Sequence, residues 1–91
     1  MDKQTATDIA VKSLHNLGQD ENELMRFIME SGIVAEDIYN MASTDAFLTG
    51  VLDYYMGNEP LLLAFATANG IDPADIPKAR QAMDAVENAE V

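Results

Sequence analysis

The chain has 91 residues, with 16 acidic against 5 basic side chains and a formal net charge of −11 at pH 7. This length predicts a single domain, and a hydrophobic fraction of 48% is too high for a disordered segment. Because cysteine is absent, disulfides and zinc–thiolate sites are excluded. The sequence has no apolar run long enough to cross a membrane and no signal-peptide pattern at its start, so we expect a cytoplasmic protein.

The basic residues are confined to the two ends of the sequence. No lysine or arginine occurs between Phe27 and Pro77, where eight acidic residues lie. Such a surface repels phosphate backbones and anionic membranes, so we expect binding to neither nucleic acid nor membrane. Two interpretations of the acidity stay open. It keeps a small protein in solution, or it matches a partner with a basic face.

Hydrophobic period and end signals predict an all-α domain, a compact bundle of five to six short helices. In chain order the predicted helices cover about residues 5–17, 20–31, 35–42, 44–56, 58–68 and 72–87. One domain should span residues 1–87, followed by a frayed tail at 88–91.

The starts and stops of these helices have recognisable signals. Gly18 should end the first helix, and Asp20 with Glu23 three residues later forms a capping-box pattern for the second. Thr44 and Asn58 are the expected N-caps of the fourth and fifth helices.

The last two helices raise separate expectations. The fifth is apolar almost all round, which is typical of a buried helix, so we expect it at the centre of the bundle and the second helix outside. Asp72 should cap the sixth helix, with Pro73 at its first position. Pro77 cannot donate a backbone hydrogen bond, so the helix either begins again there or is kinked.

The sequence repeats itself with an offset of 38 residues, because residues 20–38 align with 58–76. Seven aligned pairs are identical: Glu21/Glu59, Leu24/Leu62, Phe27/Phe65, Gly32/Gly70, Ile33/Ile71, Asp37/Asp75 and Ile38/Ile76. We interpret the chain as two similar three-helix halves, 5–42 and 44–87, whose stacking would bury the hydrophobic face of each. Chance similarity between amphipathic helices is the alternative.

Residues 63–80, LAFATANGIDPADIPKAR, have the spacing of a helix-turn-helix. A DNA-reading helix needs basic or amide side chains near its start. This segment offers Asp72 and Asp75 instead, and phosphates repel both. The turn geometry is therefore compatible with the motif, whereas the charge is not.

Motifs for catalysis or metal binding are missing from the sequence. His15 is the only histidine, and its position predicts a solvated side chain near the end of the first helix. The paired acids suit helix starts, and no calcium loop, phosphate loop or nucleophile elbow occurs. We therefore expect no catalytic residue, no metal and no cofactor.

A protein–protein interaction or adaptor module is the function that we expect. Met25 and Met29 lie beside the apolar stripe of the second helix, and Val11 lies off the stripe of the first. Packed side by side, these helices would form a partner-binding patch from the three residues. The alternatives are that the third helix covers them, or that the chain is a small-molecule-binding protein or an enzyme with an unrecognised site. The partner would be a cytoplasmic protein, and the chain itself a monomer or a weak homodimer.

The sequence also resembles a known family. The resemblance extends from about Thr7 to Met83, and its most specific part is VLDYYMGNEPLLLAF at 51–65. The pattern is similar to an uncharacterised bacterial family of small helical proteins, the domain of unknown function 3572. This resemblance implies a bacterial cytoplasmic protein, and it implies no activity, substrate or catalytic residue.

Overall fold

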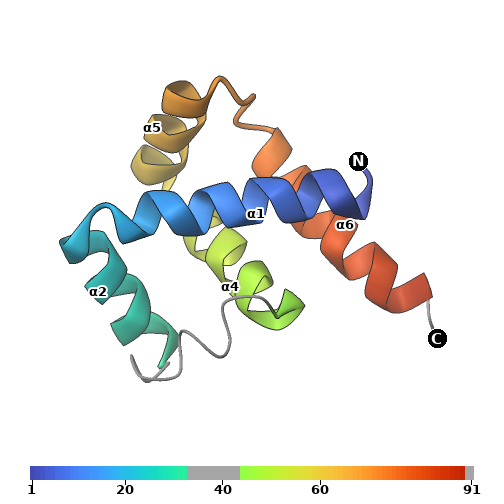
Figure 1. The fold of residues 1–91 in the computed structure, drawn as a ribbon, viewed down its shortest axis with the longest axis horizontal. Coiled ribbons are helices and arrows are strands. Elements are labelled where there is room, and N and C mark those ends of the chain that lie inside the picture. The colour runs from blue at the N-terminus through green and yellow to red at the C-terminus, as the bar shows by residue number, and fades with distance from the viewer. Residues whose placement is uncertain (33–43, 90–91) are drawn as a thin grey trace.

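A computed structural model describes residues 1–32 and 44–89, with the side chains of the last helix described as far as Met83. Within these residues the fold is five α-helices without a strand, which confirms the predicted all-α class (Figure 1). The helices are α1 (Lys3–Gly18), α2 (Glu21–Ser31), α4 (Asp45–Met56), α5 (Glu59–Asn69) and α6 (Asp75–Ala89). The predicted third helix at 35–42 lies outside the described residues. The predicted boundary between the domain (1–87) and a tail (88–91) stays a prediction.

Three predicted N-caps are confirmed. Each capping side-chain oxygen accepts backbone N–H groups of the first helical turn, which otherwise have no partner in the helix. The distances are 3.1 and 3.3 Å at Asp20, 3.2 Å at Thr44 and 3.4 Å at Asn58. The local sequence therefore fixes where α2, α4 and α5 begin.

Gly18 is the last residue of α1, as predicted, but the helix does not end in a left-handed glycine cap. The chain leaves α1 through Gln19 in a right-handed conformation. The turn closes with the N–H of Asp20 donating to the carbonyl of Leu17 at 3.1 Å, so no left-handed glycine is needed there.

The start of α6 also differs from the prediction. The Asp72 carboxylate accepts from the N–H of Ala74 at 2.9 Å in a turn, and the helix begins three residues after Asp72. Pro77 falls in the first helical turn, where a backbone N–H would have no helical acceptor. The proline therefore neither splits nor kinks α6.

The core lies between α1, α4 and α6, which make the most extensive contacts with one another (Figure 1). Small side chains let these helices approach closely, because Ala6, Ala10 and Ala79 are fully buried. The larger buried residues of the three helices are Ile9, Leu17, Phe47, Leu48, Val51, Leu52, Tyr55, Ile76 and Met83. Two ion pairs border this core, Lys3–Asp45 at 2.6 Å and Arg80–Asp53 at 2.8 Å.

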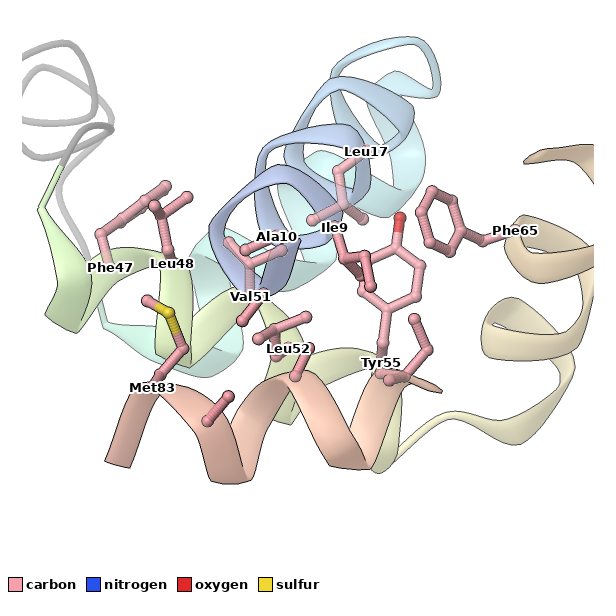
Figure 2. Packing of buried hydrophobic residues seen from close by; sticks show 14 of the residues in the cluster. Ile9, Ala10, Leu17, Phe47, Leu48, Val51, Leu52, Tyr55, Phe65 and Met83 are labelled. Carbon is pink, nitrogen blue, oxygen red and sulfur yellow. The ribbon is translucent and has the colours of Figure 1, made fainter. Parts of the chain in front are cut away.

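Tyr55 joins three helices at the centre of the molecule (Figure 2). Its hydroxyl donates to the carbonyl of Ser13 at 2.8 Å and accepts from the side-chain amide of Asn16 at 2.9 Å, both on α1. Its ring meets Phe65 of α5 edge to face, with ring centres 5.2 Å apart. Full burial of the hydroxyl is tolerated because both bonds are made.

The prediction that the fifth helix is the central one is wrong. Only Phe65 and Ala66 of α5 are buried, while Leu63 is 43% exposed. Figure 1 places α5 at the edge of the bundle, beyond α1 and α4. The space at the centre is filled by α6, whose small residues pack against α1 and α4.

We predict opposite effects of adding a methyl group at two glycines. Gly70 ends α5 with φ 63°, a left-handed conformation, so Gly70→Ala should lower the free energy of unfolding by roughly 1 kcal/mol. Gly50 lies inside α4, and nothing lies within 4 Å of the position of an added Cβ. Gly50→Ala should therefore raise stability, by up to about 1 kcal/mol. Urea denaturation measures both, and effects of the same sign would contradict these helix assignments.

We also predict that Tyr55→Phe costs about 1 to 2 kcal/mol of unfolding free energy. The substitution keeps the ring packing and removes the two hydrogen bonds that link α4 to α1. Tyr54→Phe is the comparison, because it removes a single hydrogen bond, to Glu23, from a residue that is only half-buried. Urea denaturation of both variants should show the larger loss for Tyr55→Phe, and equal losses would refute a special role for the buried hydroxyl.

Candidate functional site

A cleft of about 320 Å³ lies where α2 faces the end of α4 and the start of α5. Its lining combines one arginine, two carboxylates and a tyrosine with the α4–α5 turn, namely Arg26, Glu30, Asp53, Tyr54, Gly57 and Asn58. A second hollow of about 220 Å³ shares three of these residues, Glu30, Asp53 and Tyr54, and reaches Phe27 and Gly50. The two hollows therefore form one continuous polar surface between α2 and α4.

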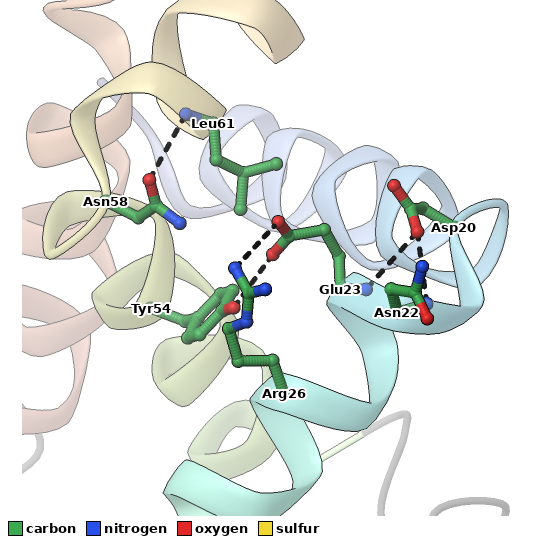
Figure 3. Close-up of polar contacts among 7 residues, drawn as sticks. All are labelled: Asp20, Asn22, Glu23, Arg26, Tyr54, Asn58 and Leu61. Carbon is green, nitrogen blue, oxygen red and sulfur yellow. Dashed lines mark hydrogen bonds and ion pairs between the residues drawn. The ribbon is translucent and has the colours of Figure 1, made fainter.

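Glu23 ties α2 to α4 beside this cleft (Figure 3). One carboxylate oxygen accepts from the Tyr54 hydroxyl at 2.9 Å, and the other pairs with Arg26 at 3.4 Å. The Tyr54 ring rests edge to face on Phe27, with ring centres 5.4 Å apart. The side chains that line the cleft are thus fixed by contacts between the two helices.

The sequence pattern predicts a different role for Glu23. A capping box would turn its carboxylate back to the N–H of Asp20, but that N–H already donates to Leu17 at 3.1 Å. Asp20 caps the helix by itself, and Glu23 reaches Tyr54. Only the placement of α4 beside α2 distinguishes the two outcomes, so no signal in the sequence could have found the contact.

The Tyr54 phenol at the cleft stays protonated over a wide range of pH. Desolvation, followed by the hydrogen bond to Glu23, raises the pKa of Tyr54 to about 12. Near neutral pH this phenol is a hydrogen-bond donor and does not act as a base. Asp53 is held by Arg80 at 2.8 Å.

A third hollow of about 240 Å³ lies between α1 and the end of α5. It contains the single histidine, since Lys12, His15, Asn16 and Gln19 line one side, and Ala68 and Asn69 the other. His15 is exposed, and its Nε2 lies 3.1 Å from the Gln19 amide. Among the residues that the structure describes, no group of three or more histidine or carboxylate side chains could hold a metal ion.

The residues of the predicted partner patch are all exposed. Val11 is 49%, Met25 55% and Met29 77% exposed. The two methionines lie four residues apart on one face of α2. Val11 lies on α1, on the face away from Ile9 and Ala10, and its union with the methionines in one patch stays a prediction.

The outer face of α5 is an apolar surface that sequence reasoning missed. It consists of residues at the spacing of a helical stripe, all exposed: Pro60, Leu63, Ala64, Thr67 and Ala68. No charged residue occurs from Pro60 to Ile71. We refer to these five residues as the α5 stripe. The all-round apolar character was visible in the sequence, but it was interpreted as burial.

The similarity to known proteins extends over most of the chain and is not limited to the residues of this site. Residues 3–85 match the family described as Protein of unknown function (DUF3572), and the chain belongs to that family. Neither the curated proteins nor the solved structures contain a match. None of the described helices is long and apolar enough to traverse a lipid bilayer.

We predict that stability falls as the pH rises from about 10 to about 12. The pKa values of Tyr54 and Tyr55 are both raised to about 12, mainly by desolvation, from 10.0. In this window the unfolded chain releases protons that the folded chain retains, so the unfolded state gains stability. Denaturation curves at stepped pH measure the effect. The double variant Tyr54→Phe with Tyr55→Phe should lose most of this pH dependence, and an unchanged slope would contradict the assignment.

Proposed function

We propose that the chain is a protein-interaction module that docks on another protein through the α5 stripe. The observation that carries this proposal is the exposure of an uncharged helix face at the edge of the bundle. A helix at the surface of a globular protein normally presents charged side chains to water, yet α5 presents Leu63, Ala64 and Ala68 there. Exposed apolar surface of this kind is typical of docking sites.

The attachment of α5 supports the same interpretation. Its inner face contributes Phe65 and Ala66 to the buried core, and Leu61 and Leu62 pack against that core partly buried. Burial therefore explains the inner residues of the helix and leaves its outer residues without a structural role. A binding role accounts for both faces.

The methionine pair is a second candidate surface for the same function. Met25 and Met29 are exposed on α2, and flexible methionine side chains suit adaptable binding surfaces. The partner-binding patch that the sequence predicts from these two methionines and Val11 stays a prediction. The α5 stripe is preferred because it is longer and carries no charge.

A small-molecule-binding role is the alternative, and the α2–α4 cleft is the observation that favours it. Its volume of about 320 Å³ is at the lower end of the range for ligand pockets. Arg26 and Asp53 offer it both signs of charge, and the Tyr54 hydroxyl oxygen offers an acceptor because its proton is donated to Glu23. A metabolite that raised the melting temperature and lost this effect in Tyr54→Phe would support that role over docking.

Several other expectations from the sequence are also proposals. We propose a non-enzymatic bacterial protein of the cytoplasm, a monomer or weak homodimer with no affinity for nucleic acid. We also propose the internal duplication. Its support is that Asp20 and Asn58 both cap helices, and that Gly32 and Gly70 both end them with positive φ, 74° and 63°.

We predict that Ala64→Arg abolishes partner capture while it leaves the fold intact. Ala64 is exposed in the middle of the α5 stripe, so an arginine there blocks docking without entering the core. The control is Gln81→Arg, which adds the same side chain at an exposed position of α6. Proteins captured from the native host by the wild type should be identified and purified. Their dissociation constants for both variants should then be measured by calorimetry.

The double variant Met25→Glu with Met29→Glu completes this experiment. Both methionines are more than half exposed, so the variant should melt close to the wild type. If it loses the partner while Ala64→Arg retains it, then α2 is the docking surface and the proposal for α5 is wrong.

A further inference from the structure

The structure points to the chemistry of the partner, and this inference rests on the proposed docking through α5. We infer that the α5 stripe binds an amphipathic helix with an apolar face and with lysine or arginine beside that face. The small side chains of the stripe, Ala64, Thr67 and Ala68, let a second helix approach closely. The charge around the stripe then determines which kind of helix is bound.

Acidic side chains border the N-terminal end of the stripe. Glu59 lies four residues before Leu63 on the same side of α5, and both are exposed. The turn that precedes Glu59 forms one wall of the cleft that contains Glu30 and Asp53. A lysine or arginine near one end of a bound helix would meet these carboxylates at the start of α5.

Internal ion pairs neutralise only part of this acidity, because Asp53 pairs with Arg80 and Arg26 lines the same cleft, so Glu59 is the carboxylate that a basic partner would meet. Three of the five basic side chains, Lys3, Arg26 and Arg80, pair with carboxylates of the chain itself, and 16 acids stand against those five. The C-terminal end of α5 has a different neighbour, because Lys12 and His15 line the hollow beside Ala68. Basic residues of the partner are therefore expected at the Glu59 end.

A second copy of the chain fits this surface less well. Each copy carries a net charge of −11, and pairing two α5 helices would bring Glu59 and Asp72 of both copies to one interface. Like charges disfavour that arrangement, whereas a basic helix gains attraction from the same residues.

The test uses two synthetic helical peptides with the same apolar stripe. One carries lysine beside the stripe, and the other carries glutamate at the same positions. Fluorescence anisotropy gives their affinities for the full chain at low and high salt. Amide chemical-shift changes in the labelled protein locate the bound peptide. We expect the lysine peptide to bind at least tenfold more tightly, to lose affinity as salt rises, and to shift residues of α5.

A charge-reversed pair of variants makes the test specific. Glu59→Lys should weaken the lysine peptide about fivefold or more. Glu21→Lys is the matched control, because Glu21 occupies the same first-turn position of α2 and is likewise exposed. An equal loss of affinity for the lysine peptide in both variants would mean that only the net charge of the protein matters. That result would overturn a binding site at α5.

The remaining outcomes separate this inference from the proposed function. Equal or tighter binding of the glutamate peptide at α5 would refute a basic partner and leave docking through α5 standing. Binding that shifts α2 alone, or a homodimer with α5 at its interface, would overturn the inference. Loss of partner capture in Ala64→Arg decides the proposed function independently of either peptide.

Discussion

The buried hydroxyl of Tyr55 is the constraint on which the arrangement of the helices depends. A phenol without hydrogen-bond partners in the core would destabilise the fold, so α4 must lie where Ser13 and Asn16 of α1 can reach it. That requirement fixes the rotation of α4 against α1. Alanines on α1 and α6 then allow the third helix of the core to pack closely against both. Ser13 and Asn16, which lie 42 and 39 positions before Tyr55 in the chain, thus set the register of the bundle.

The position of α5 follows from the same tyrosine. Phe65 packs on the Tyr55 ring, and together with Ala66 it provides all the fully buried surface that α5 contributes. Since α6 already covers the rest of the core, the opposite face of α5 stays in water. Its apolar character is therefore a property of the surface. The proposed docking depends on this packing, because the core leaves α5 with one occupied face and one uncovered face.

Glu23 illustrates how one sequence pattern can have two physical outcomes. An aspartate followed three residues later by a glutamate fits a capping box, and Asp20 does cap α2. The glutamate instead bonds Tyr54 and pairs with Arg26, and this contact shapes the polar cleft between α2 and α4. Local geometry permits both arrangements. The hydroxyl of Tyr54 decides between them, because it presents a donor 2.9 Å from the carboxylate and the Asp20 N–H already has an acceptor.

The sequence by itself determined the all-α class and the starts of α2, α4 and α5. These features depend on backbone groups within one or two turns, so nearby residues suffice to satisfy them. The exposure of Met25 and Met29 was also expected from helical period. Only the tertiary structure decided that α5 lies at the edge and that Glu23 reaches Tyr54. The hydrophobicity of a helix predicts that it avoids water. It does not predict which helix stays at the surface once smaller side chains of another helix have filled the centre of the core.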